Sequence, residues 1–497
     1  RRLIDTSHGR VPDLDGIGTI QLLGSIAMDS LRISAGVDSY PRLGDRVYAA
    51  PHSFIANLPK FMEAAEAEAS HVLLKLGSID VAPESYVSVK PEKLFGRHCA
   101  ILGATGGGKS WTTARIIEEC LRYKTKIILL DATGEYRGFD GEHVANFHLG
   151  APVNTAKSSA PCTLPQTSFI ESDFIALFEP AGKVQGPKLR AAIRSLRLAA
   201  LAPHVATGGI IKKIDQSKVP IMTEEAKAGI AEKLDDPQQA FDVWKLVSQI
   251  EQECVYPDGF GSARGQKDFT KWGGDSGEVS FCLSLMSRIN GILSSSSFEC
   301  VFKSKAPALT EKISSFVSNE DRLLRICLSG VAFEFKAREI VANVIGRHLL
   351  NMARNGAFKS RPVVVIVDEA HNFLGRQIGA DDAVARLDAF ELIAKEGRKY
   401  GLNICLSTQR PRDITEGVLS QMGTLVVHRL TNDRDREVVE RACGEVDRSA
   451  SSFLPNLKPG EAAIIGADFP IPLTIQVFPP SAKPLSDGPN YQTNWKV

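Results

Sequence analysis

Residues 98–110 read His-Cys-Ala-Ile-Leu-Gly-Ala-Thr-Gly-Gly-Gly-Lys-Ser. An apolar run leads into a glycine-rich turn that fits the pattern GxxxxGK[ST] in full, and a helical pattern with Ile116, Ile117 and Cys120 on one side follows it. Glycines let backbone N–H groups converge on phosphate oxygens, and a helix N-terminus adds partial positive charge. The alternative is that the glycine-rich turn occurs by chance and binds no phosphate. The stretch predicts a strand, a phosphate-binding loop and a helix, in that order.

We expect this loop to bind ATP together with Mg²⁺. Lys109 would reach the β- and γ-phosphates, and Ser110 would hold the metal ion. The residues that we assign to nucleotide binding are Gly103, Ala104, Thr105, Gly106, Gly107, Gly108, Lys109, Ser110, Trp111, Asp131 and Glu135.

A second motif reads Pro-Val-Val-Val-Ile-Val-Asp-Glu-Ala-His over residues 362–371. Its buried strand would deliver two carboxylates to the edge where open α/β sheets bind ligands. Asp368 would anchor Mg²⁺ through water, and Glu369 would polarise the attacking water as a general base. The alternative is that Glu369 only caps the next helix. Beside a phosphate-binding loop, the acidic pair indicates hydrolysis as well as binding.

Two further polar segments follow predicted strands. Asp131 and Glu135 lie in the stretch 131–136, where they would orient water or metal or, alternatively, form a turn with an N-cap. Gln409 lies just beyond a central strand and would sense the γ-phosphate. Its alternative role is that of a loop amide bonded to its own backbone.

Short apolar runs alternate with helical patterns from residue 91 onward. This alternation predicts an α/β fold with a mainly parallel sheet and crossover helices. Between the second and third strands, helical patterns at 187–201, 223–234, 238–253 and 279–293 indicate a helical insertion; Pro187 fits the first turn of its helix. The expected strands are 98–102, 126–131, 323–329, 363–368, 402–407 and 424–430, and a further helix is expected at 336–355.

The chain divides into five expected parts. Residues 1–90 have the turn spacing of a small β-barrel or sandwich. The sheet domain is split into 91–160 and 321–478 around the insertion at 161–320, and the Pro/Ser/Asn-rich residues 479–497 form a C-terminal arm.

Composition excludes several classes of protein. With 497 residues, 59 Lys and Arg against 58 Asp and Glu, and 43% hydrophobic residues, the chain is neither disordered nor globally basic. No apolar run approaches the ~20 residues of a membrane span, and no signal peptide opens the sequence. Residue 1 is Arg, so we expect the natural start upstream. Nine cysteines without a CxxC pair predict reduced structural thiols in a cytoplasmic protein.

Two segments are candidates for contact with DNA. In the acid-free stretch 181–214, Arg190, Arg194 and Arg197 recur at i, i+4 and i+7 on one helix face, which could follow a phosphate backbone; the alternative is a solvated face or a protein contact. The loop 374–379 is the second candidate, and its alternative is a plain surface loop.

In the stretch 94–110 the sequence resembles the opening of the HerA-type hexameric DNA translocases. Later blocks agree in order, and together they span almost all of 91–478: residues 131–136, 368–371, 395–401, 407–411, 419–424, 429–432 and 458–462. Trp111 departs from the resemblance, because family members usually have a small or polar residue there.

The resemblance implies a RecA-like core interrupted by a helical bundle, preceded by a small barrel. It implies a homohexameric ring around DNA, with ATP between neighbouring subunits and a C-terminal segment braced against the next subunit. Among the candidate arginines Arg97, Arg398 and Arg429, it implies that Arg97 reaches the adjacent subunit's nucleotide and that Arg398 acts near the γ-phosphate. Glu135 and Gln409 match polar residues around the phosphates.

The function that follows is an ATP-driven DNA translocase or helicase. The resemblance implies a bacterial member that works with a separate effector, a nuclease or a sirtuin-like NAD-consuming enzyme, in antiphage defence or DNA end processing. Two alternatives remain open: a ring scaffold that activates a partner without processive unwinding, and a conjugation or secretion ATPase, against whose anchored forms the lack of a membrane segment argues.

Overall fold

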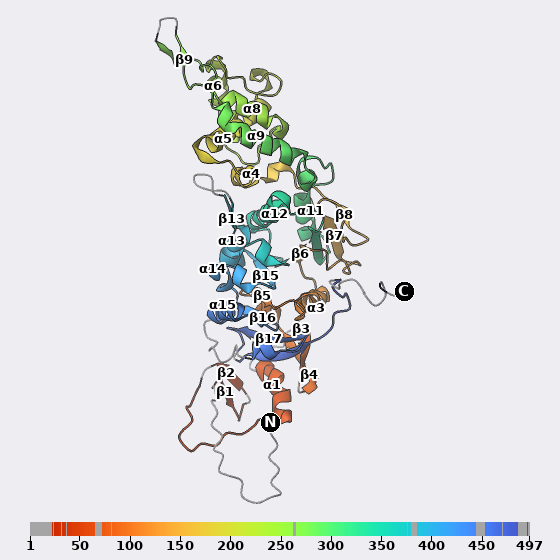
Figure 1. Cartoon of the computed structure of the whole chain (residues 1–497). Helices are drawn as coiled ribbons and strands as arrows, with labels where there is room; N and C mark the ends of the chain where they lie inside the picture. The colour runs from red at the N-terminus through yellow and green to blue at the C-terminus, as the bar shows by residue number, and fades with distance from the viewer. Residues whose placement is uncertain are drawn as a thin grey trace, which may run out of the picture.

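The computed structural model describes residues 22, 24–30, 32–35, 37–64, 72–80, 82–261, 265–374, 376–378, 385–443, 453–469, 471–485 and 495. The molecule is elongated (Figure 1). A helical region lies at one end, a mixed sheet with its helices occupies the middle, and the N-terminal hairpin lies at the opposite end.

A single sheet forms the centre of the described chain, with the strand order β4-β3-β18-β17-β16-β5-β15-β12-β6-β11-β7-β8. From β16 to β8 every neighbouring pair is parallel, so the prediction of a mainly parallel sheet is confirmed. All six expected strands are present: β5 (Cys99–Leu102), β6 (Ile127–Asp131), β11 (Leu323–Cys327), β12 (Val363–Val367), β15 (Leu402–Thr408) and β16 (Thr424–Val427). The far edge is β7 (Val144–His148) and β8 (Ala160–Pro161).

The N-terminal region differs from the expected barrel. β3 (Leu74–Ile79) and β4 (Ala82–Val89) extend the central sheet, because β3 pairs with β18 (Leu473–Val477), which in turn pairs with β17 (Glu461–Gly466). This pairing satisfies backbone groups that an edge strand would leave open. Within the described part of 1–90, the other strands are a hairpin, β1 (Gly24–Ala27) and β2 (Arg32–Ala35), against which α1 (His52–Ala64) packs. The boundary expected at residue 90 therefore crosses a continuous sheet.

Helices cover both faces of the sheet. α3 (Lys109–Leu121) contributes Ile116, Ile117 and Cys120 to one buried cluster, as its pattern predicted. The opposite face is covered by α12 (Ala337–Arg354) and α13 (Ala389–Glu396). Shorter elements complete this region: α2 (Pro91–Phe95), α14 (Glu416–Leu419), α15 (Asp433–Cys443), β13 (Arg376–Ile378) and β14 (Ala385–Leu387).

The segment between β8 and β11 is mainly helical and projects beyond the sheet (Figure 1). Pro187 lies inside α5 and not in its first turn, because the helix begins five residues earlier than the pattern indicated. The helix expected at 223–234 is two helices, and of 238–253 only the second half is α-helical. The elements are α4 (Glu171–Phe178), α5 (Gly182–Leu201), α6 (Val219–Glu225), α7 (Ala228–Leu234), α8 (Leu246–Glu253), β9 (Gly259–Phe260), β10 (Lys267–Asp268), α9 (Val279–Ser294), α10 (Glu299–Phe302) and α11 (Leu309–Ser318).

Eight cysteines have described side chains, and all eight are buried free thiols. Among the described residues, no helix combines the length and apolar character needed to cross a membrane.

A buried ion pair fastens the insertion to the sheet domain. Arg347 of α12 donates to both carboxylate oxygens of Asp173 in α4, with Nη1 2.9 Å from Oδ1. The same carboxylate accepts from the backbone N–H of Ile170 at 2.8 Å, which caps the start of α4. Asp173 is almost fully buried. Its removal would therefore leave a partly buried guanidinium without its counter-charge.

We predict that Asp173→Ala lowers the free energy of unfolding by about 3 kcal/mol, because one member of a buried pair is lost. Glu171→Ala is the matched control on the same helix: its pair with Arg190 is half exposed, and we expect it to cost at most about 1 kcal/mol. Chemical unfolding followed by circular dichroism measures both. Equal effects of the two substitutions would contradict the anchoring role.

A buried histidine makes stability depend on pH. His98 has a left-handed backbone (φ 65°), and its Nδ1 accepts from the backbone N–H of Ile404 at 3.1 Å. Burial lowers the pKa of His98 to about 4, and the nearby charge of Arg398 acts in the same direction. In an unfolded chain the imidazole has a pKa of about 6.5.

Since the unfolded chain takes up this proton first, stability is lost as the pH falls from about 6.5 toward about 4. We predict that His98→Asn reduces this loss, because Asn tolerates the left-handed conformation and its Oδ1 replaces the Nδ1 acceptor without titrating. The unfolding midpoint in urea, measured from pH 7 to pH 5 for both proteins, tests this. Identical pH dependence would refute the assignment.

Candidate active site

The phosphate-binding loop connects β5 to α3 and is held from behind by two other segments. The Ala104 N–H donates to the Arg429 carbonyl at 3.0 Å, and the Gly460 N–H donates to the Gly107 carbonyl at 3.1 Å. Gly108 has φ 112°, a conformation that disfavours any residue with a Cβ. At Gly103 an added Cβ would lie 2.6 Å from the Cβ of His428. The loop thus needs glycine both for its path and for its contact with the chain behind it.

His428 joins this loop, the first turn of α3 and the start of β17. Its Nδ1 donates to the Glu461 carbonyl and its Nε2 accepts from the Thr112 hydroxyl, each at 2.8 Å. Burial lowers the pKa of His428 to about 4. The ring is therefore neutral at neutral pH, and its role is to hold the loop in place.

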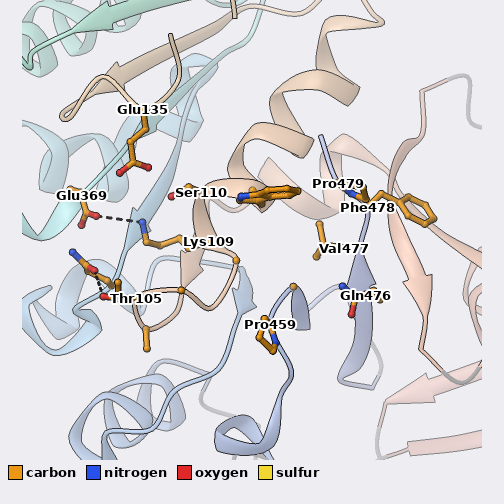
Figure 2. A pocket seen from close by; sticks show the side chains of 16 residues that line it. Thr105, Lys109, Ser110, Glu135, Glu369, Pro459, Gln476, Val477, Phe478 and Pro479 are labelled. Atoms are coloured by element: carbon orange, nitrogen blue, oxygen red, sulfur yellow. Dashed lines mark hydrogen bonds and ion pairs between the residues drawn. The ribbon is translucent and has the colours of Figure 1, made fainter. Parts of the chain in front are cut away.

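Lys109 connects the loop to the acidic pair after β12. Its Nζ lies 3.6 Å from Oε1 of Glu369 and 3.8 Å from Oδ1 of Asp368, as Figure 2 shows for the first pair. Burial opposes the charge, but the carboxylates of Asp368, Glu369 and Glu135 outweigh it and raise the pKa of Lys109. The lysine remains charged at the point where a phosphate would arrive.

Asp368 is buried at the end of β12. It accepts from the Ser407 hydroxyl at 3.1 Å and from the Tyr136 hydroxyl at 3.4 Å. Burial raises the pKa of Asp368 to about 7; Lys109 opposes this rise and the neighbouring carboxylates reinforce it. A divalent cation would favour the ionised form, and carboxylate and hydroxyl oxygens are the ligands that Mg²⁺ prefers. Asp368 and Ser110 therefore fit a magnesium site.

Glu369 lines the cavity at the end of β12. Its backbone is left-handed (φ 47°), which is strained for this residue type. Among the described residues, its buried Oε2 has no hydrogen-bond partner, although Nδ1 of His371 lies 3.2 Å away. That histidine nitrogen instead bonds the Thr408 hydroxyl at 3.1 Å. A carboxylate in the wall of the cavity can accept a proton from a bound water.

Lys109, Ser110 and Glu369 border a cavity of about 830 Å³, whereas Asp368 is buried behind them and is not part of its wall. Of the residues predicted from the sequence, it is lined by Ala104, Thr105, Gly106, Gly108, Lys109, Ser110, Trp111, Glu135, Glu369 and Gln409. Gln409 does not bond its own backbone through its oxygen; Oε1 accepts from the Thr105 hydroxyl at 2.8 Å. Gly103 and Gly107 shape the loop without lining the cavity.

Sequence reasoning missed the wall opposite the loop. This wall consists of Pro459, Gly460, Gln476, Val477, Phe478 and Pro479 (Figure 2). The first two lie in one of the blocks that carry the resemblance, but the end of β18 has no chemical signal in the sequence. Only the pairing of β17 with β18 brings these residues together.

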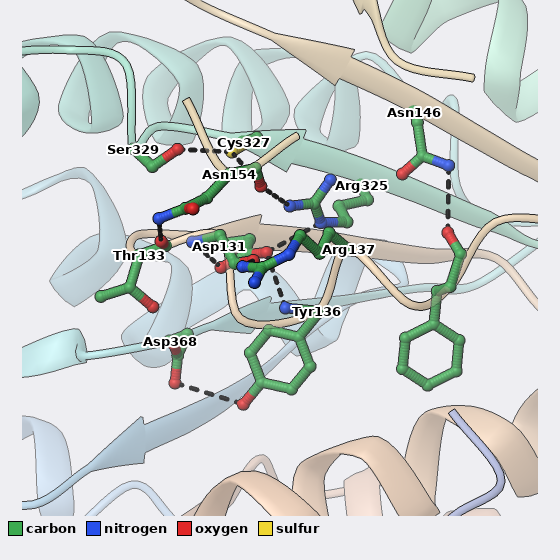
Figure 3. A network of polar contacts seen from close by, with 12 residues as sticks. Asp131, Thr133, Tyr136, Arg137, Asn146, Asn154, Arg325, Cys327, Ser329 and Asp368 are labelled. Carbon is green, nitrogen blue, oxygen red and sulfur yellow. Dashed lines mark hydrogen bonds and ion pairs between the residues drawn. The ribbon is translucent and has the colours of Figure 1, made fainter. Parts of the chain in front are cut away.

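The structure corrects the role of Asp131. Its carboxylate is fully buried and accepts from the Gly134 N–H at 2.7 Å, the Tyr136 N–H at 3.1 Å and Nε of Arg325 at 2.8 Å (Figure 3). Asp131 does not line the cavity, because these contacts turn it into the sheet. Asp131 therefore has the alternative role, as part of a turn. Glu135 lies near the end of this turn and does line the cavity.

The candidate arginines lie away from this chain's own cavity. Arg97 is half exposed, with Nε 3.9 Å from Asp468, and Arg398 is exposed after α13. Arg429 supplies only its backbone carbonyl to the loop. Within the described chain, the cavity has no arginine in its wall.

The basic face of α5 is paired within the insertion. Arg190 bonds Glu171 at 2.7 Å, Arg194 pairs with Asp235, and Arg197 is buried against the carbonyls of 234 and 237. These pairs favour the alternative interpretation, a solvated face or a protein contact, while a contact of this face with DNA stays a prediction. The second DNA candidate is the loop 374–379. Its residues 375 and 379 lie outside the described residues, and residues 376–378 form β13.

Comparison with known proteins places this site in context. Residues 74–244 match the family model described as "Helicase HerA, central domain". The chain is 22% identical over 466 residues to "Probable helicase MJECL08" of Methanocaldococcus jannaschii, covering 93% of this chain and 79% of that protein. It is 23% identical over 404 residues to the DNA double-strand break repair helicase HerA of Saccharolobus solfataricus, covering 81% of this chain and 68% of that protein.

Among solved structures, the plasmid coupling protein TrwB in complex with a non-hydrolysable ATP analogue is similar, with a TM-score of 0.48 and 16% identity over 86% of this chain and 95% of that one. The sequence matches agree with the geometry of the loop, the lysine and the acidic pair. Residues 74–244 are thus similar to the central domain of the HerA helicases, and the chain is an ATPase of the helicase class.

Proposed function

We propose that the protein is an ATP-dependent DNA translocase or helicase motor that works as a homohexameric ring. The observation that carries the proposal is the position of Lys109 between the phosphate-binding loop and the pair Asp368 and Glu369, of which Glu369 lines the cavity. This arrangement has the binding and proton-accepting groups that nucleotide hydrolysis requires.

In the proposed mechanism, loop N–H groups and Lys109 bind the phosphates of ATP. Ser110 and Asp368 would hold Mg²⁺, which supplies positive charge beside the transferred phosphoryl group. Glu369 orients the attacking water and takes its proton on its carboxylate. Gln409, bonded to Thr105 of the loop, is placed to change partner when the γ-phosphate leaves.

The ring is proposed because the resemblance implies that Arg97 and Arg398 act at a nucleotide, and neither of them lines the chain's own cavity. DNA as the substrate is supported by the relatives that are named DNA double-strand break repair helicases. Of the two roles that the resemblance implies, these names support DNA end processing more directly than antiphage defence.

A separate effector is also part of the proposal. Exposed aromatic side chains on the insertion, including Phe260, Phe269 and Phe281, favour a contact with another protein. The same observation keeps a second candidate open, a ring scaffold that activates a partner enzyme. The two functions differ in whether a ring unable to hydrolyse ATP still activates the partner.

We predict that Lys109→Ala and Glu369→Gln each abolish DNA-stimulated ATP hydrolysis, but for different reasons. Loss of the lysine should remove ATP binding, whereas loss of the general base should leave binding intact and lower kcat by about 10²–10⁴-fold. A phosphate-release assay and equilibrium binding of ATP measure the two effects. Glu437→Gln, on an exposed surface pair, is the control. Hydrolysis that survives both active-site substitutions would refute this site.

We predict that Arg398 acts across a subunit interface. Arg398→Ala should lower hydrolysis by at least about 10³-fold, as expected for an arginine finger, while the neighbouring exposed Lys399→Ala should not. Mixing Arg398→Ala with Lys109→Ala subunits should restore partial activity, since each supplies what the other lacks. If mixed oligomers remain inactive although they assemble, the arginine does not act on the neighbour. The same pair of experiments with Arg97→Ala tests the second arginine.

A further inference from the structure

The cavity has two chemically different ends. Around the loop it is lined by charged, hydroxyl and amide groups, most of which the proposed phosphate chemistry uses. The other end is largely apolar, and hydrolysis gives it no role; its side chains are Trp111, Pro459, Val477, Phe478 and Pro479, with Gln476 as the polar exception. A cavity of about 830 Å³ is within the usual range for ligand sites and exceeds what a triphosphate group alone requires.

Trp111 is the largest side chain at the apolar end. It follows Ser110 in the first turn of α3, and 38% of its surface is exposed. An aromatic ring left open beside a phosphate site is a surface for a flat, apolar group.

The chain after β18 holds this ring in place. Residues 479–485 cross α3, and the Ser481 N–H donates to the carboxylate of Glu118 at 3.2 Å. Lys483 then lies over the Trp111 ring, with Nζ 5.8 Å from its centroid. The segment ends where the Leu485 N–H donates to the Glu135 carbonyl at 2.9 Å. One face of the ring is thus covered by a cation, which leaves the other face for a ligand.

The opposite wall is also fixed. The Val477 N–H donates to the Gly460 carbonyl at 3.0 Å, and the Phe478 N–H donates to the Leu76 carbonyl at 2.9 Å. The Phe478 ring packs edge-on against Tyr86, with centroids 5.8 Å apart. Because both walls are anchored, the slot between them is largely formed before any ligand arrives.

We propose that this apolar end binds the nucleotide base, with a purine stacked on Trp111 and bordered by Val477 and Pro479. The proposal rests on the proposed function, because it places the triphosphate on the loop. The polar-to-apolar order along the cavity then matches the order of phosphates, sugar and base in ATP. A purine is preferred to a pyrimidine because its larger ring system buries more area on the indole.

The test compares ATP with inorganic tripolyphosphate, which has the phosphates without the base. Binding of each in the presence of Mg²⁺ is measured by calorimetry for the unaltered protein, Trp111→Ala and Trp111→Phe. We expect Trp111→Ala to weaken ATP binding about tenfold, as loss of one base–aromatic stack does, and to leave tripolyphosphate binding unchanged. Trp111→Phe should keep most of the affinity. The unaltered protein should bind ATP more tightly than UTP, and Trp111→Ala should lose this difference.

Trp244→Ala is the matched control, because this tryptophan is also half exposed but belongs to the insertion. Equal weakening of ATP and tripolyphosphate by Trp111→Ala would overturn the proposal and would make Trp111 a support of the loop. Unchanged ATP affinity in that variant would overturn it too. Failure of the proposed function has a different signature: Lys109→Ala would then leave the binding of both ligands intact. Thermal melting confirms that each variant is folded.

Discussion

The contact between the phosphate-binding loop and His428 is the constraint on which the rest of the site depends. A loop that keeps some of its N–H groups for a ligand must have its path fixed by contacts with other segments. Gly103 and Gly108 allow the chain to lie directly against the imidazole, while carbonyls at 107 and 429 bond the neighbouring backbone. The neutral ring in turn connects α3 with β17. The sheet edge beyond β16 is therefore part of the nucleotide site.

Charge balance is the second constraint. Three carboxylates surround one lysine, and the most buried of them, Asp368, has its pKa raised to about 7. Such a cluster is electrostatically incomplete, because one ammonium group cannot neutralise all the carboxylates. Phosphates would bind to Lys109, and a divalent cation would bind to Asp368. Glu369 then remains beside His371 in the wall of the cavity, where its carboxylate can act as a general base.

Much of the core could be predicted because its signals are local. A buried parallel strand is a short apolar run in the sequence. The phosphate-binding loop and the acidic pair each follow such a run directly. The stretches 98–110 and 362–371 therefore predict both a strand and the site residues at its end. Asp131 could not be resolved in this way, since its role depends on Arg325, a residue 194 positions away that the sheet places beside it. The pairing of β3 with β18 is equally non-local. Consistent with it, the HerA-type match begins at residue 74, the start of β3, and not at the expected boundary.

The C-terminal segment shows why the site extends beyond its motifs. β18 supplies the wall opposite Trp111, and the chain that follows crosses α3 to reach the carbonyl of Glu135, whose side chain faces the phosphates' end of the cavity. One continuous stretch, 476–485, thus contacts both ends of the cavity. Leu485, at the end of this stretch, bonds the Glu135 turn, and the hydroxyl of the next residue, Tyr136, bonds Asp368. A continuous path of contacts therefore joins the wall of the apolar end to the carboxylate at the end of β12.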